Sequence, residues 1–271
     1  MALTNKFFIF CFGMFALFAD VLSEPLKHVK YQLSHGEVIH VVKASPEDYR
    51  LEIMVDQDRK RQYFSWFLNQ KSGVSAAVNG GFFHGSGQPS GFFKYGQWWT
   101  YARKHRAVIG ISDDGGQQEL YFDRLKLVDG AVFSRFHQDP WWDQADFVLG
   151  GAPLLIYRGE VVSFEEERVS PLFAKNRYAR TAFCVDSHGD MLFVLITGVG
   201  RLLHNYGLRS GIALTDFAQE LKKLDCYYAV NLDGGRSSSL FVEGGFISSH
   251  WSQWFFPKRI ANVLAFVKKT A

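Results

Sequence analysis

The chain has 271 residues, of which 47% are hydrophobic, so it can bury the core of one large domain or two small ones. Its 30 basic and 27 acidic residues leave a formal net charge of +3, and no block of lysine and arginine forms a basic face. Composition and charge therefore argue against a nucleic-acid partner.

The N-terminus has the pattern of a signal peptide. Lys6 precedes an uncharged apolar run over residues 7–19, and Val21 and Ser23 suit the −3 and −1 positions of a cleavage site; cleavage after Ala19 is the alternative. The run is shorter than the ~20 residues that a transmembrane helix needs. We therefore predict a signal peptide over residues 1–23, a domain over residues 24–271, and an exported, periplasmic or secreted protein with no membrane span in the mature chain.

The first half of the domain is predicted to consist mainly of strands. Alternating apolar residues indicate strands at 37–44 and 49–55, and a short helix is expected within 61–70. The apolar residues 74–78 then form a buried strand that delivers Asn79. Residues 107–122 predict a hairpin that turns at Asp113-Asp114-Gly115-Gly116.

The second half begins with residues 132–146, which show little periodicity and are expected to form a surface loop. The charged stretches 165–168 and 175–177 are interpreted as a mobile loop bordering the site. Residues 178–186 and 191–197 predict a second hairpin.

A helix over 216–224 follows, with Thr215 as its N-cap, and 261–267 is the closing strand. Strands dominate and no linker divides the chain. The prediction is one sheet-rich α+β domain with a mixed β-sheet core and few helices.

The cysteines leave one question open. Cys11 lies in the signal region, whereas Cys184 and Cys226 each lie in an apolar, strand-like run. In an oxidising compartment these two could pair, or each could remain a small buried thiol. No dinucleotide-binding, P-loop or zinc-protease motif is present, and we expect no cofactor and no metal.

Five short motifs follow one another along the chain: Asn79-Gly80-Gly81-Phe82-Phe83, Gly150-Gly151-Ala152-Pro153, Arg180-Thr181-Ala182, Asn231-Leu232-Asp233-Gly234-Gly235, and Arg259 with Asn262. The ordered set resembles the phosphodiester glycosidase family. The resemblance implies a hydrolase whose substrate is a carbohydrate or glycosyl phosphate. This sequence departs from the family at Arg236, where a third glycine is usual, and the departure concerns the substrate more than membership.

Cleaving a sugar from a phosphodiester requires a cationic group for the phosphate and one carboxylate, because the phosphate leaves readily. Asp233 is the candidate carboxylate, acting as general base, as nucleophile or as ligand to sugar hydroxyls. Arg180 is the candidate phosphate clamp, the alternative being a structural ion pair. Asn79 is the third candidate catalytic residue, since its amide offers donors and an acceptor to a sugar.

Further residues are predicted to bind the substrate, with Gly80 and Gly81 forming a nest of backbone N–H groups for an anion. Arg236 is either a second clamp or a solvated charge. The remaining predicted substrate-binding residues are Thr181, Asn231, Gly234, Gly235, Ser237 and Ser238.

Two other functions are kept as alternatives. One is a glycan-binding module that retains the fold but has lost catalysis, a reading favoured by Arg236. The other is a metal-dependent hydrolase centred on Asp233 with His84 or His204, although no ligand spacing supports it.

Overall fold

The computed structural model describes residues 25–34, 36–197, 211–248 and 257–270. The proposed signal peptide therefore lies outside the described residues, as does His204. Among the helices of the described ranges, none has the length and apolar character needed to cross a membrane.

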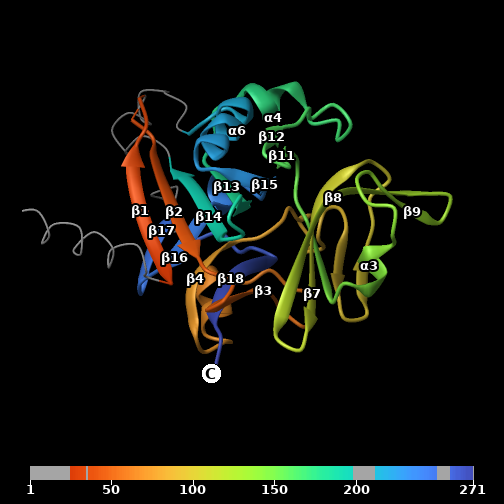
Figure 1. Ribbon diagram of the computed structural model, residues 1–271, viewed down its shortest axis with the longest axis horizontal. Helices are drawn as coiled ribbons and strands as arrows, with labels where there is room; N and C mark the ends of the chain where they lie inside the picture. Colours follow the sequence, from red (N-terminus) through yellow and green to blue (C-terminus); the bar gives the residue numbers. More distant parts are fainter. Residues whose placement is uncertain (1–24, 35, 198–210, 249–256, 271) are drawn as a thin grey trace, which may run out of the picture.

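The described residues form three antiparallel sheets, with α6 and α4 at one end (Figure 1). The seven-stranded sheet has the order β1 (Leu26–Gln32), β2 (Val38–Ala44), β14 (Met191–Thr197), β13 (Arg180–Asp186), β15 (Cys226–Asn231), β11 (Leu154–Tyr157) and β12 (Glu160–Val161). The six-stranded sheet has the order β6 (Trp98–Thr100), β5 (Phe93–Tyr95), β10 (Phe147–Gly150), β7 (Arg106–Asp114), β8 (Gln117–Val128) and β9 (Ala131–Ser134).

The five-stranded sheet carries the first motif on its middle strand. Its order is β17 (Gly245–Ser248), β16 (Ser239–Val242), β4 (Val74–Asn79), β18 (Asn262–Lys268) and β3 (Tyr49–Val55). The described helices are short: α2 (Phe64–Leu68), α3 (Trp141–Gln144), α4 (Pro171–Lys175), α6 (Leu214–Lys223) and the 3-10 turn η2 (Gly235–Ser237).

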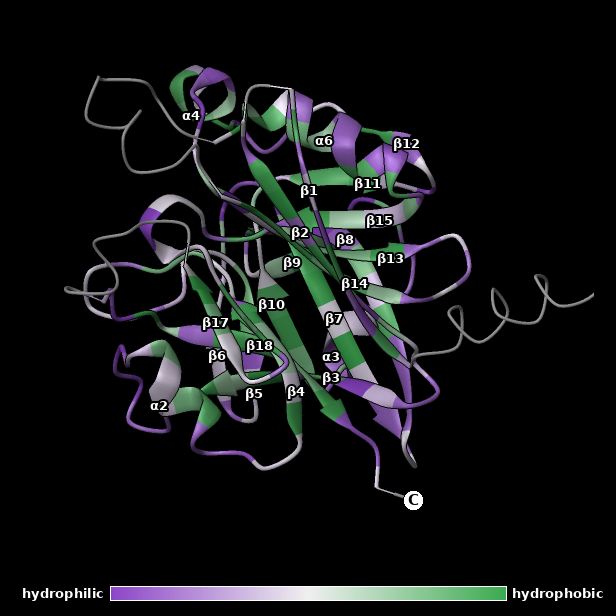
Figure 2. Ribbon diagram, turned by 90° about the vertical axis from the view of Figure 1, so that its left-hand side faces the viewer, coloured by the Kyte–Doolittle hydropathy of each residue, from purple (hydrophilic) through white to green (hydrophobic). Residues whose placement is uncertain are grey.

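Strand β13 shows how the sequence packs the domain. Successive strand side chains point to opposite faces, so Phe183 enters the central core between the sheets while Ala182 and Cys184 enter a second core beneath α6. Because both faces are covered, the strand is apolar along most of its length. In Figure 2 hydrophobic residues follow the strands, whereas the loops and the outer side of α6 are more hydrophilic.

The prediction of a sheet-rich α+β domain with few helices is confirmed, although the pairings of the described strands are all antiparallel in place of the mixed core expected. The structure also answers the question of the cysteines. Cys184 and Cys226 form a disulfide between β13 and β15, with their Cα atoms 5.8 Å apart.

Two local predictions are wrong. Residues 132–146 include β9 and α3, and both tryptophans of α3 are buried. The indole of Trp141 donates a hydrogen bond to the buried carboxylate of Asp123 at 3.0 Å, so this segment fills the core. Helix α6 begins at Leu214 with Ala213 as its N-cap, and Thr215 does not cap it.

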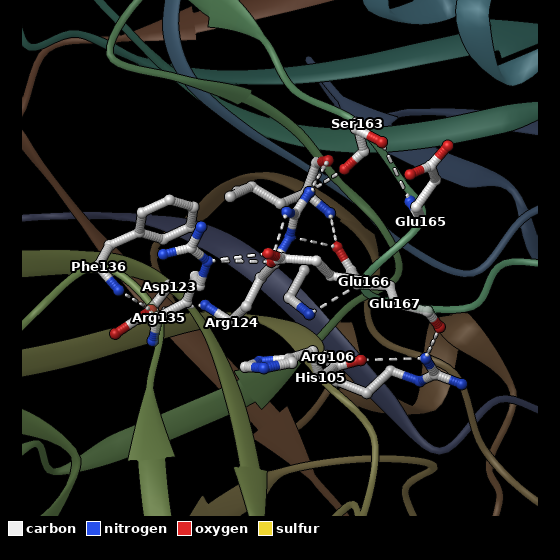
Figure 3. A network of polar contacts seen from close by, with 12 residues as sticks. His105, Arg106, Asp123, Arg124, Arg135, Phe136, Ser163, Glu165, Glu166 and Glu167 are labelled. Atoms are coloured by element: carbon white, nitrogen blue, oxygen red, sulfur yellow. Dashed lines mark hydrogen bonds and ion pairs between the residues drawn. The ribbon is translucent and has the colours of Figure 1, made fainter.

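The segment before α4 is held by a buried carboxylate, contrary to the mobile loop expected there (Figure 3). The side chain of Glu167 is fully buried and accepts hydrogen bonds from the backbone N–H groups of Ala107 and Leu154, at 3.0 and 2.8 Å. Glu167 also accepts a hydrogen bond of 2.9 Å from the guanidinium of Arg124. The same guanidinium donates to the carbonyl of Ser163 at 2.6 Å. Glu167 therefore joins the six-stranded sheet to the seven-stranded sheet and fixes the chain that leads into α4.

Candidate active site at the ends of three strands

The ends of β4, β13 and β15 meet at the turn that follows β15. The N–H of Asp233 donates to the carbonyl of Gly80 at 3.1 Å, which joins this turn to β4. The N–H groups of Leu232 and Gly235 donate to the carbonyls of Thr181 and Ala179, both at 2.8 Å. Asp233 consequently lies beside Arg180 in the backbone, and segments far apart in sequence form one site.

Asn79 was predicted to contact a sugar, but its side chain forms hydrogen bonds with the neighbouring segments of the protein. Its Nδ2 donates to the carbonyl of Asp233 at 2.7 Å, and its Oδ1 accepts from the hydroxyl of Thr181 at 2.9 Å and from the N–H of Ser239 at 3.1 Å. The residue is only 1% exposed. Asn79 and Thr181 therefore position the site, because their hydrogen-bonding groups are already engaged inside the protein.

The predicted anion nest at Gly80 and Gly81 is wrong, since both N–H groups have a partner. Gly80 donates to the carbonyl of Asn262 at 3.0 Å, and Gly81 donates to its Oδ1 at 2.7 Å. A Cβ at Gly80 would lie 2.0 Å from that same Oδ1. Glycine is required at position 80 because Asn262 approaches it so closely. These contacts join the first motif to the last motif.

The carboxylate of Asp233 is held by three different groups. It accepts from the N–H of Gly234 at 2.9 Å and from the hydroxyl of Ser237, and Oδ2 lies 3.8 Å from the ammonium of Lys258. Burial raises the pKa of Asp233, whereas the hydroxyl of Ser237 and the charge of Lys258 oppose that rise. Its side chain remains 16% exposed, so a ligand can reach it.

Lys258 was not predicted. Its Nζ donates to the Oγ of Ser237 at 2.7 Å and lies 5.2 Å from the ring centre of Phe83. It stands beside Arg259 of the last motif but belongs to none of the motifs, and a single lysine before a strand gives no signal in sequence. Only its proximity to an already recognised motif could have suggested it.

The guanidinium of Arg180 is buried, and its hydrogen-bond acceptors among the described residues are backbone carbonyl groups. Its Nη2 donates to the carbonyls of Phe173 and Asn176, at 2.7 and 3.1 Å, and its Nε donates to the carbonyl of Ile212 at 3.3 Å. The ring of Phe173 lies 4.6 Å from the guanidinium carbon. Burial lowers the pKa of Arg180 to about 10, so the group remains charged at neutral pH.

No ion pair to Arg180 occurs within the described ranges, and its Nη1 has no hydrogen-bond partner there. The structural ion pair that was the alternative for Arg180 is therefore not seen among those residues. An Arg side chain that is charged, buried and incompletely satisfied is suited to an anionic ligand.

The remaining predicted substrate-binding residues lie at the end of β15 and in the turn that follows it. Gly235 adopts a φ of +60°, and a Cβ at Gly234 would lie 2.8 Å from the carbonyl of Ala179. The Oδ1 of Asn231 and the Oγ of Ser238 are buried without a partner in the described part of the chain, whereas Arg236 is exposed. Buried polar atoms of this kind are uncommon, and here they gather on the motifs.

Among the residues that the structure covers, no three His, Cys, Asp or Glu side chains are grouped to hold an ion. Phe82 packs its ring against that of Phe173, at 5.9 Å between centres, and so links the first motif to α4 above Arg180. The arrangement thus combines two cations and one carboxylate with half-buried aromatic rings.

The model of the phosphodiester glycosidase family (NAGPA) matches residues 72–267 of this chain. No curated protein sequence matches it. Among solved structures, the catalytic domain of zebrafish N-acetylglucosamine-1-phosphodiester alpha-N-acetylglucosaminidase, auto-inhibited by its pro-peptide, is similar with a TM-score of 0.65 and 19% identity, over 92% of this chain and 85% of that one.

Two bacterial structures are also similar. A hypothetical protein from Synechocystis has a TM-score of 0.62 and 18% identity, over 89% of this chain and 62% of that chain, so the present chain spans less than two thirds of its length. A putative exported protein from Burkholderia pseudomallei K96243 has a TM-score of 0.59 and 15% identity, over 86% and 74% of the two chains. At these identities the likenesses establish the fold.

Proposed function

The chain belongs to the phosphodiester glycosidase family, and we propose that it is an exported hydrolase that cleaves a sugar-1-phosphodiester in a glycan or cell-envelope substrate. The apolar run near Lys6 supports export to the periplasm or the medium. The carbohydrate character of the substrate follows from the family.

The observation that carries the proposal is the buried guanidinium of Arg180, on the strand that lies beside the turn carrying Asp233. A charge removed from water costs free energy unless an opposite charge or a full set of hydrogen bonds compensates it. Arg180 has carbonyl partners for Nε and Nη2, and its Nη1 is unpartnered in the described residues. A phosphodiester monoanion would supply both the missing charge and the missing acceptor.

Asp233 then acts on the sugar side of the same bond. Its carboxylate is partly exposed and fixed by Gly234 and Ser237, so it can accept a proton from water or attack the anomeric carbon without first reorganising. The leaving group is a phosphate monoester, which departs without strong acid assistance. One anion holder and one carboxylate therefore suffice for the reaction.

Two substitutions test this division of labour. Asp233→Asn keeps the shape of the side chain but removes its charge, and should lower kcat by ~10²-fold or more while the Kd of the substrate changes little. Arg180→Met should instead weaken binding as well, because the phosphate is held in the ground state. Asp58→Asn, at an exposed ion pair with Lys60, is the matched control and should leave both constants unchanged.

The assay measures release of sugar and phosphate monoester from a panel of sugar-1-phosphodiesters, with binding followed by calorimetry. Turnover that survives Asp233→Asn would remove Asp233 from the mechanism. A wild-type protein that binds the panel but hydrolyses none of it would identify a glycan-binding module in place of an enzyme.

A further inference from the structure

Lys258 makes contacts that connect it to Asp233 by two routes. Its ammonium lies 3.8 Å from Oδ2 of Asp233 and donates a hydrogen bond of 2.7 Å to Oγ of Ser237. Ser237 is 1% exposed and in turn hydrogen-bonds the carboxylate. The three residues come from the turn after β15 and from the segment that enters β18, so they are brought together only by the fold.

The direction of the two hydrogen bonds, from Lys258 to Ser237 and from Ser237 to Asp233, is fixed by the chemistry of the donor groups. An ammonium group has only donors, so the Oγ of Ser237 accepts from Lys258. The hydroxyl proton of Ser237 is then left to point at Asp233, which accepts it when ionised. Both the direct charge and the relayed hydrogen bond favour the same state of the carboxylate.

We propose that Lys258 is a positioning residue of this site, which keeps the Asp233 carboxylate ionised and holds it in one orientation, directly and through the hydroxyl of Ser237. The inference rests on the proposed function in taking Asp233 as the reacting carboxylate. It assigns a role to a residue outside every motif, and it makes the carboxylate of Asp233 competent at a lower pH than its burial alone would allow.

Among the charged groups of the described residues, it is the charge of Lys258 that opposes the rise in the pKa of Asp233. Arg180 is its backbone neighbour on β13, but its guanidinium is directed to the carbonyls of Phe173 and Ile212. Arg236 follows in η2 with an exposed side chain. Among the described residues, the amide of Asn79, the carbonyl of Gly80 and the N–H of Gly234 also contact Asp233, and all three are neutral.

The experiment titrates the carboxyl carbon of Asp233 by ¹³C NMR in the wild type and in four variants. Lys258→Met should raise the titration midpoint by about one pH unit, the lower end of the range for a close opposite charge, because Lys258 is one-third exposed. Lys258→Arg should restore it, and Ser237→Ala should raise it by less. Lys60→Met, which changes the net charge equally at a distant exposed pair, should leave it in place.

The pH profile of kcat/KM is measured on the same proteins with a sugar-1-phosphodiester. Its acidic limb should move with the NMR midpoint, and Lys258→Arg should return it, which a purely structural role would not produce. An unchanged midpoint in Lys258→Met, or an equal shift in Lys60→Met, would overturn the assignment. Absence of turnover in the wild type would refute the proposed function alone, since the NMR titration needs no activity; Lys258→Arg and Ser237→Ala decide the matter if Lys258→Met does not fold.

Discussion

Replacing Asn79 with alanine should destabilise the domain by about 4 kcal/mol. Asn79 is buried, and its side chain satisfies the carbonyl of Asp233, the N–H of Ser239 and the hydroxyl of Thr181. Each backbone group left buried and unpaired costs about 1–3 kcal/mol, and the hydroxyl costs about 1 kcal/mol because it can rotate toward another acceptor. The sum is a large part of the 5–15 kcal/mol by which a domain of this kind is typically stable.

Two companion variants separate the contributions. Asn79→Asp keeps the acceptor that serves Thr181 and Ser239 but presents an oxygen to the carbonyl of Asp233, so it should lose about 2 kcal/mol at neutral pH. Thr181→Val removes a single donor and should cost about 1 kcal/mol. The two residues share one hydrogen bond, and the double variant Asn79→Ala with Thr181→Val should therefore lose less than the sum.

The measurement is urea-induced unfolding followed by circular dichroism, with the slope m compared between variants so that only differences at equal m are interpreted. A free energy of unfolding for Asn79→Ala within about 1 kcal/mol of the wild type would refute the reasoning, since the three groups left without a partner should together cost at least about 3 kcal/mol. Asn79 would then be free to take the role of sugar ligand that its motif suggested.

Other predictions concern the strands that support the site. Replacing Cys184 and Cys226 together by alanine should lower the free energy of unfolding by about 2–4 kcal/mol, because the disulfide closes a long loop, and a reductant should have the same effect on the wild type but none on the variant. Burial and the charges of His28 and Lys30 lower the pKa of His40 to about 4, so the unfolded chain binds a proton below its pKa of 6.5 that the native state refuses. The contribution of His40 to the free energy of unfolding should be fully present above pH 6.5 and fall by about 3 kcal/mol as the pH drops toward 4, and His40→Gln should flatten that slope in pH-dependent urea unfolding.

Much of the fold could be predicted because strand patterns are local. The prediction for β3 matches its bounds of Tyr49–Val55, and β4 and the hairpin of β13 and β14 were found from apolar runs. Strand β1 was missed because an edge strand with one neighbour keeps exposed polar residues, as in its sequence LKHVKYQ. The aromatic residues of α3 were misread because a short helix that fills a core has too few turns to show a period.

The candidate site, like the fold, was predictable from the sequence only in part. The resemblance to a family led to Asn79, Arg180 and Asp233 as candidate catalytic residues, and the structure shows backbone contacts between the three segments that carry them. Which groups of these residues are left for a ligand was not predictable, since it depends on contacts such as that of Gly81 with Asn262. Lys258 was not predicted for the same reason, because its role depends on the 3.8 Å distance between its Nζ and Oδ2 of Asp233, a residue far away in sequence.

The fit of Gly80 against Asn262 also restricts the evolutionary history of the chain. The side-chain oxygen of Asn262 occupies the place that any Cβ at position 80 would need, and the same oxygen accepts the N–H of Gly81. A lineage that acquires a side chain at position 80 first meets a steric clash, and one that first shortens residue 262 leaves a buried donor without its partner. Either substitution made first destabilises the domain. Glycine at position 80 and asparagine at position 262 should therefore be retained together.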